Sequence, residues 1–164
     1  MALTLDGSLG VTFPSGSGTQ AAQSKVLQVV QGTLGTQASS SSSTFADTGV
    51  TASITPLFST SKVLVIVQLN ACGKQSGNTY MGVKLVRGST DIQIMESLAG
   101  YTNAADANWI GSISSTYLDS PSTTSNTTYK VQFSSQSNVA TVYVNGNSGG
   151  LLPVSTITLM EIAA

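Results

Sequence analysis

The sequence predicts an all-β protein: an antiparallel two-sheet sandwich, jelly-roll-like, preceded by an extended N-terminal arm. Short runs rich in β-branched and aromatic residues recur along the chain, and turn residues separate them at the spacing of a sandwich or barrel. No stretch shows the sustained repeat of 3.6 residues that marks a helix. An immunoglobulin-like sandwich is the alternative. It is less favoured because the chain has a single cysteine and so lacks the Cys–Trp–Cys framework of that fold.

Residues 1–25 are expected to form the arm. They are rich in glycine and serine, and their isolated apolar residues follow no sustained period, so this segment cannot build a core of its own. Pro14 beside a Ser/Gly tract favours an extended path and a turn over a helix. Residues 26–164 then form one β-sandwich domain, because the chain is long enough for a single core and too short for two.

In the first half of the domain, residues 26–30 and 45–55 are predicted strands, and the serine tract at residues 39–43 is predicted to be a flexible loop. Residues 62–70 form the most apolar predicted strand. Its successive apolar residues are Val63, Leu64, Val65, Ile66 and Val67. Alternate residues of a strand face opposite sides, so both faces of this strand need cover. We expect one face in the core and the other against a neighbouring subunit.

In the second half, residues 80–87 alternate between apolar and polar side chains. Gly88, Ser89 and Thr90 then turn the chain into residues 91–96, which predicts a hairpin. The remaining predicted strands are residues 109–118, 128–133, 139–144 and 155–162. About eight strands without intervening helices favour the two-sheet sandwich.

The composition leaves little material for catalysis. The chain has no histidine, six Lys or Arg and seven Asp or Glu. Without imidazole there is no Ser-His-Asp or Cys-His site, and a lone cysteine leaves no N/S metal site. A carboxylate-pair hydrolase is disfavoured because Asp91 and Glu96, five apart on one predicted strand, face opposite sides. The segment around Asp106 lacks the dense acids of a calcium loop. We expect no enzyme activity, no cofactor and no metal.

The charge pattern also bears on partners. Net charge is −1 and the cations are scattered, so nucleic-acid binding is not expected. The longest aliphatic run is too short to span a membrane, and the N-terminus lacks a secretory signal, so we expect a soluble protein made in the cytoplasm. Positive mean hydropathy with few charges favours an obligate oligomer. Cys72 is expected to be a buried apolar residue.

The polar connections at residues 101–109 and 119–127 are the candidate recognition loops, because loops on a rigid sandwich often carry binding sites. The candidate receptor residues in the first loop are Tyr101, Asn103, Asp106 and Trp109. Aromatic rings near a loop can stack on sugar rings. The alternative for Tyr101 and Trp109 is the more usual role, which is packing in the core or at an interface.

The N-terminal stretch TLDGSLGVTFPSGSGTQ resembles a short attachment segment of tail-fibre and appendage proteins of tailed bacteriophages. The C-terminal STITLMEIAA is similar to the last strand of the small β-domains that those proteins carry. The resemblance implies a homotrimeric virion protein, assembled in the host cytoplasm, with a domain similar in architecture to C1q-like and tumour-necrosis-factor-like jelly rolls. It also implies that the arm docks on other virion proteins. The residues expected to anchor it are Leu5, Val11, Phe13, Pro14 and Gln20.

Two functions remain open. One is a short fibre on the tail or baseplate that binds a host-surface glycan weakly through each subunit, several copies raising the avidity by about 10²–10⁴. The other is a structural role alone, as a capsid decoration, head fibre or cement, or as a baseplate or neck protein, that binds only other virion proteins. The short chain favours a compact accessory protein, whereas the long polar loops favour recognition.

Overall fold

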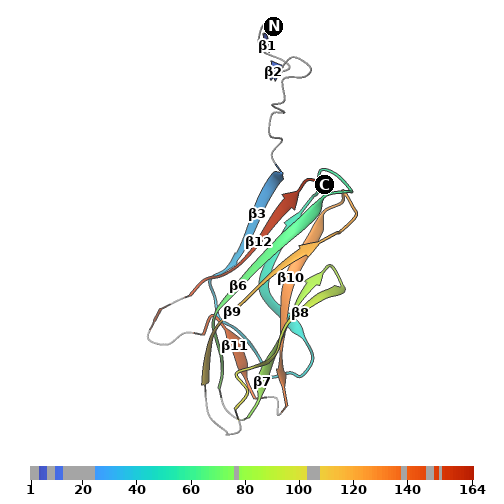
Figure 1. Cartoon of the computed structure of the whole chain (residues 1–164). Coiled ribbons are helices and arrows are strands. Elements are labelled where there is room, and N and C mark those ends of the chain that lie inside the picture. Colours follow the sequence, from blue (N-terminus) through green and yellow to red (C-terminus); the bar gives the residue numbers. More distant parts are fainter. Residues whose placement is uncertain are drawn as a thin grey trace.

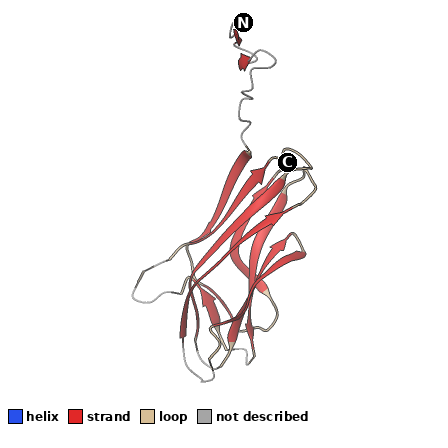
Figure 2. Cartoon of the chain, in the orientation of Figure 1, coloured by secondary structure: helices blue, strands red, loops and turns tan. Residues whose placement is uncertain are grey.

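The computed structural model describes residues 4–6, 10–12, 25–75, 78–102, 108–137, 140–146, 150–151 and 153–164. Every regular element in these ranges is a β-strand and every pairing is antiparallel, which confirms the predicted all-β class and two-sheet arrangement (Figures 1 and 2). The strands are β1 (Thr4–Asp6), β2 (Gly10–Thr12), β3 (Val26–Leu34), β4 (Ala38–Ser40), β5 (Ala46–Ile54), β6 (Lys62–Lys74), β7 (Tyr80–Arg87), β8 (Thr90–Ala99), β9 (Asn108–Asp119), β10 (Thr127–Gln136), β11 (Val142–Val144) and β12 (Ser155–Ile162).

The domain consists of two sheets. One has the order β5-β10-β7-β8. In the other, β9 pairs with β6 along one edge, from Val63 to Lys74, so β12 and β11 share the opposite edge of β6. Because β3 pairs with β12 and β4 with β11, β3 and β4 occupy the same position in the sheet, one after the other along the strand direction. We call each such position a line. This sheet has four lines, β3/β4, β12/β11, β6 and β9, so the two sheets together have eight, in agreement with the predicted number of about eight strands.

Most predicted strands are confirmed with shifted ends. The hairpin is formed by β7 and β8, where Arg87 pairs with Thr90 and Gly88 adopts a φ of +58° in the turn. The prediction of a flexible loop at residues 39–43 is wrong in part, because β4 includes the first two residues of this tract. Ser39 and Ser40 pair with β11 through the backbone. Such pairing needs no apolar side chain, so composition does not reveal it.

The predicted arm contains β1 and β2, which form a separate two-stranded sheet. Leu5 is the register partner of Val11. None of the described strands of the domain pairs with this sheet.

Alternation along β6 builds the centre of the core. Val63, Val65 and Val67 are fully buried between the sheets, as predicted for one face of this strand. Leu64 and Ile66 point to the other side, where Leu64 is half-buried and Ile66 is 37% exposed. The larger side chains that share the core are Ile54, Leu69, Met81, Leu85, Tyr129, Phe133, Ile157 and Leu159.

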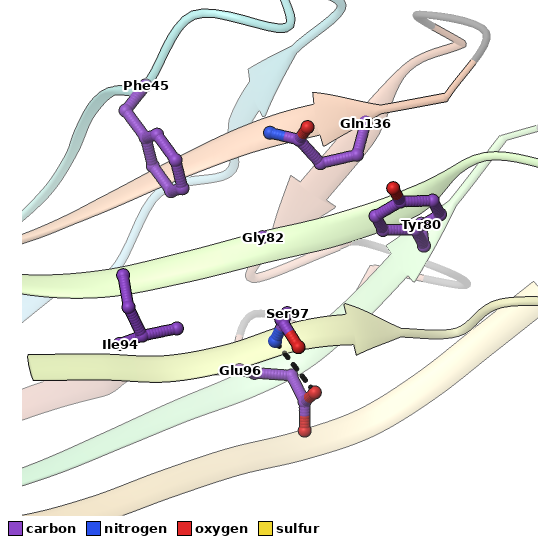
Figure 3. Close-up of a pocket in the computed structure, with 7 residues that line it drawn as sticks. All are labelled: Phe45, Tyr80, Gly82, Ile94, Glu96, Ser97 and Gln136. Atoms are coloured by element: carbon purple, nitrogen blue, oxygen red, sulfur yellow. Dashed lines mark hydrogen bonds between the residues drawn. The ribbon is translucent and has the colours of Figure 1, made fainter.

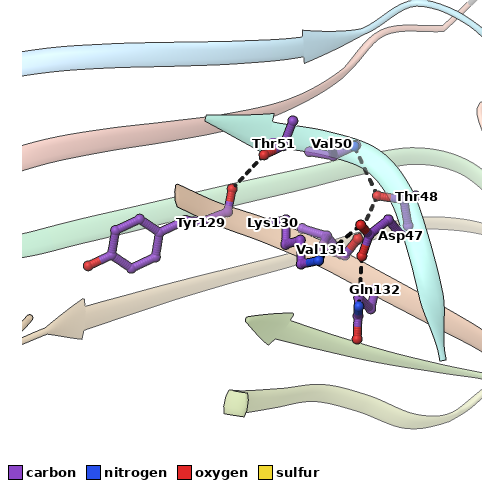
Figure 4. A network of polar contacts seen from close by, with 8 residues as sticks. All are labelled: Asp47, Thr48, Val50, Thr51, Tyr129, Lys130, Val131 and Gln132. Carbon is purple, nitrogen blue, oxygen red and sulfur yellow. Dashed lines mark hydrogen bonds and ion pairs between the residues drawn. The ribbon is translucent and has the colours of Figure 1, made fainter. Parts of the chain in front are cut away.

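Strand β5 bulges where it pairs with β10 (Figure 4). Lys130 pairs with Thr51 but Gln132 pairs with Asp47, so residues 48–50 lie opposite a single residue. Gly49 sits in this bulge with a φ of +92°, a conformation that costs glycine little and other residues more.

Side chains replace the ladder bonds that the bulge removes (Figure 4). The Thr48 hydroxyl donates to the Val131 carbonyl at 2.9 Å. Asp47 accepts from Gln132 Nε2 at 2.7 Å and from Lys130 Nζ at 3.0 Å. The Gln132 bond and, with it, the charge of Lys130 outweigh burial and lower the pKa of Asp47. The bulge is thus closed by polar contacts on both sides.

In the other sheet, Asn145 joins the broken lines. It has a φ of +54° and is almost fully buried. Its Nδ2 donates to the carbonyls of Leu34 at 2.6 Å and Thr36 at 3.1 Å, and its Oδ1 accepts from Ser155 Oγ at 2.6 Å. Its backbone N–H donates to the carbonyl of Asn70 at 2.9 Å. The side chain and backbone of one residue therefore connect three lines at the level where two of them are interrupted.

A charged cluster ties the two sheets together. Arg87 of β7 forms an ion pair with Asp119 of β9 at 2.6 Å, and the Tyr129 hydroxyl of β10 donates to the same carboxylate oxygen at 2.7 Å. Burial and the contact with Asp119 raise the pKa of Tyr129, so its phenol remains a donor. Asp119, predicted to begin a recognition loop, is instead a buried residue that joins opposite sheets.

We predict that Tyr129→Phe lowers the free energy of unfolding by about 1.5–3 kcal/mol, because it removes a buried hydrogen bond to a charged acceptor. Urea unfolding at one fixed protein concentration measures the change. Tyr117→Phe on β9 is the matched control, since Tyr117 is half-buried and has no comparable bond. Equal losses in the two variants would contradict the assignment.

Candidate functional site

The carboxylates whose side chains are described form ion pairs and hydrogen bonds within the fold. Asp47, Asp91 and Asp119 form ion pairs with Lys130, Lys84 and Arg87. Glu96 accepts two backbone N–H bonds. Within the described residues, no group of three or more His, Cys, Asp or Glu is placed to hold a metal ion. Asp106, at the centre of the segment that was compared with a calcium loop, lies outside the described residues.

Cys72 is fully buried in the core, which confirms the prediction of a buried apolar residue. Burial raises the pKa of its thiol to about 12. The thiol therefore stays protonated near neutral pH and is a poor nucleophile.

Glu161 is a buried carboxylate that holds the connection between β5 and β6. Its Oε1 accepts the backbone N–H of Leu57 at 2.8 Å, with Phe58 N at 3.4 Å, and its Oε2 accepts from Gln28 Nε2 at 2.6 Å. Burial alone would raise the pKa of Glu161, but these hydrogen bonds outweigh it and lower the pKa. Leu57 and Phe58 themselves are exposed.

The predicted anchoring residues are described only in part. Leu5 and Val11 are register partners in the pairing of β1 with β2. Phe13, Pro14 and Gln20 lie outside the described residues.

Two of the four predicted receptor residues are described, and their rings pack against different partners. Asn103 and Asp106 lie outside the described residues. Trp109 lies on β9 and is 51% exposed, with its ring 5.3 Å from that of Tyr143 in an edge-on contact. Tyr101 follows β8 in the other sheet, is similarly exposed, and packs edge-on against Tyr80 at 5.9 Å. Neither ring is therefore in the core of the chain, whereas the other half of the alternative, packing at an interface, stays a prediction.

The two candidate recognition loops flank opposite ends of β9 (Figure 1). A strand of 12 residues spans roughly 40 Å at about 3.3 Å per residue. Within a single chain, the two ends of β9 to which these loops connect are therefore far apart, and the assignment of a receptor contact to either loop stays a prediction.

An apolar patch crosses the outer face of the β6 sheet. Register pairs Val29 with Met160, Met160 with Leu64, and Leu64 with Leu118, so these residues form one row across all four lines. Val29 is 55% and Leu118 is 50% exposed, and Ile66 lies in the adjacent row. These five residues are called the outer-face patch below. The sequence indicated only the β6 part of it.

A pocket of about 300 Å³ lies on the outer face of the other sheet (Figure 3). Its floor is Gly82 of β7, and its walls are Phe45, Tyr80, Ile94, Glu96, Ser97 and Gln136. Tyr80 begins β7 and Gln136 ends β10, and the two are register partners. This end of the sandwich is opposite to the end where Lys25 leads into β3 (Figure 1). We call this feature the distal pocket.

Sequence reasoning missed the distal pocket, although it singled out Tyr101, which supports Tyr80. The only local signal was Gly82, a glycine inside an apolar strand. No protein-family model matches the sequence, and no curated protein matches it. Across the described ranges, no helix is long and apolar enough to cross a membrane.

We predict that Glu161→Gln destabilises the protein by about 1 kcal/mol at pH 7, because an amide cannot accept all the bonds that the carboxylate receives. A lowered native pKa stabilises the fold above the unfolded value of about 4.3, and this contribution disappears as the pH falls through the native pKa. The difference from the unsubstituted protein should therefore shrink towards pH 3 in urea unfolding. Asp91→Asn, in an exposed ion pair, is the control; a Glu161→Gln deficit that stays constant with pH would contradict the prediction.

Proposed function

We propose that this chain is a structural virion protein of a tailed bacteriophage: a short homotrimeric fibre attached to the tail or baseplate by residues 1–25, with the sandwich projecting outward. The outer-face patch is the observation that supports a trimer. Contiguous exposed apolar residues on a soluble domain mark an interaction surface. A second and third copy of this chain are the proposed cover, because few charges oppose their approach.

The strand order supports a jelly roll. Numbered along the chain, the eight lines have the order 1-8-3-6 in the sheet of β6 and 2-7-4-5 in the other. Each sheet combines early and late lines, as in a double-sheet jelly roll built from two Greek keys. The proposed architecture is therefore similar to that of C1q-like and tumour-necrosis-factor-like trimers.

The position of the patch also supports attachment through the arm. Lys25, where the chain leads into β3, accepts a backbone bond from Ala163 just past β12. Val29 and Met160 of the patch lie a few residues away on the same strands. Association through the patch would bring the N-terminal segments of the copies to one end and leave the distal pocket at the other.

The alternative is a capsid decoration, head fibre or neck protein that binds only other virion proteins. Leu57 and Phe58 favour it, since these exposed apolar side chains lie at the arm end of the sandwich, beside Glu161. Cryo-electron microscopy of intact virions carrying the labelled protein distinguishes head, neck and tail positions. Recognition of a host-surface glycan belongs to the fibre proposal and not to this alternative.

We predict that Leu64→Lys and Ile66→Lys leave the domain folded but convert the trimer to a monomer, because each places a charge in the proposed interface. Val65→Lys should instead prevent folding, since Val65 is fully buried. Sedimentation equilibrium and circular dichroism measure the two properties. Ser53→Lys, on the exposed face of the other sheet, is the control and should remain trimeric. An unsubstituted protein that is monomeric at micromolar concentration would contradict the proposal.

We predict that deletion of residues 1–24 leaves a folded, trimeric domain that no longer joins virions. The reason is that β1 and β2 pair with each other and with no described strand of the domain. Circular dichroism reports folding, and co-sedimentation with virions reports attachment. A truncated protein that still decorates virions would show that the anchor lies elsewhere, with Leu57→Ser/Phe58→Ser as the next variant to test.

A further inference from the structure

We propose that the distal pocket binds one pyranose ring of a neutral saccharide. The proposal rests on the proposed function as an attachment fibre and names its ligand class. A hollow of about 300 Å³ is at the lower end of small-ligand sites and is large enough for one sugar ring.

Gly82 is the first observation, because it makes the hollow possible. Its φ is not among the positive values of the chain, so the backbone there would accept other residues. An added Cβ would lie 3.1 Å from Phe45 Cζ and 3.1 Å from Ser134 Oγ, within the floor of the pocket. Glycine inside a strand weakens the strand and often marks close approach of a ligand. Space, and not conformation, is what glycine provides here.

Two aromatic rings form opposite walls of this floor. Figure 3 shows Phe45 and Tyr80 on either side of Gly82, with Ile94 completing the apolar side. The negatively polarised faces of aromatic rings attract the C–H groups that a pyranose presents on its flat faces. Tyr101 packs edge-on against Tyr80 and supports its position.

The polar groups of the pocket suit sugar hydroxyls. Glu96 Oε1 accepts the N–H groups of Ser97 at 2.8 Å and Leu98 at 3.0 Å, which fixes the carboxylate and leaves Oε2 as an acceptor. Gln136 Nε2 donates to Ser134 Oγ at 2.5 Å, so its Oε1 is directed elsewhere as a second acceptor. The ligand must therefore bring donors, and hydroxyl groups provide them.

The charge of the pocket selects against acidic sugars. Glu96 is its charged lining residue. Lys84 lies 4.5 Å from the centre of the Phe45 ring, but its ammonium group is paired with Asp91 at 2.8 Å. A carboxylate on the ligand would meet Glu96 without a free cation in the lining, which favours a neutral ring over a uronic or sialic acid.

Saturation-transfer NMR on the full-length protein tests the proposal. The probes are the methyl pyranosides of glucose, galactose, mannose and N-acetylglucosamine, with methyl glucuronide as the acidic comparison. At least one neutral glycoside should receive saturation at millimolar concentration and the glucuronide should not. Gly82→Val should weaken binding at least tenfold by filling the floor, and Tyr80→Ala should weaken it similarly. Phe58→Ala, which removes an exposed aromatic residue at the arm end of the sandwich, is the matched control and should bind normally.

If Gly82→Val fails to fold, binding by Tyr80→Ala and Glu96→Gln is measured in its place. Glu96→Gln should also reduce the preference for a neutral over an acidic sugar. The proposal is overturned if no neutral glycoside binds, if the glucuronide binds as well, or if Phe58→Ala and not Tyr80→Ala removes binding. An intact trimer that joins virions but binds no sugar would overturn this inference alone. A monomer that binds sugar would overturn the trimer alone.

Discussion

Strand β6 positions most of the sandwich, because both of its edges are paired over most of its length. β9 takes one edge, and β12 with β11 takes the other. The alternation of β6 then assigns its valines to the core and Leu64 and Ile66 to the outside. The register of its neighbours places Met160 and Leu118 on the same outer face beside Leu64, where Leu118 is exposed and Met160 is half-buried. The core and the outer-face patch are two results of one pairing scheme, and a one-residue slip would exchange them.

The interruption held by Asn145 divides the same sheet into two surfaces. On the arm side, continuous pairing produces the outer-face patch. On the distal side, β11 and β4 replace the longer strands, and the aromatic residues there are Trp109, which is exposed, and Tyr143, which is half-buried. Gly73 and Gly146 make room for Tyr143, since an added Cβ at either would lie within 2.6 Å of its ring. The sheet can thus present an aliphatic surface at one end and an aromatic one at the other without a change of fold.

Sequence patterns predicted the features that depend on alternation, and missed those that depend on which strands meet. That one face of residues 63–67 lies in the core was predicted from sequence alone, although which residues form that face was not, and the hairpin followed from its Gly-Ser turn. The burial of Asp119 requires Arg87 and Tyr129 from the opposite sheet, so neighbouring residues give no sign of it. The distal pocket likewise collects β7, β8, β10 and Phe45, which lie far apart in the chain. β4 escaped prediction because its serines pair through the backbone.

The place of β12 between β3 and β6 has a consequence for synthesis on the ribosome. β3 is the first strand of the domain to emerge and β12 the last of the described strands, yet they are neighbours. Until β12 is translated, β3 has no partner in its sheet and one edge of β6 is open along residues 62–68. Such an unpaired, apolar edge can recruit strands of other nascent chains. Polysomes that translate several copies side by side would therefore bring together chains with matching open edges, which favours strand pairing between chains in place of pairing within one chain.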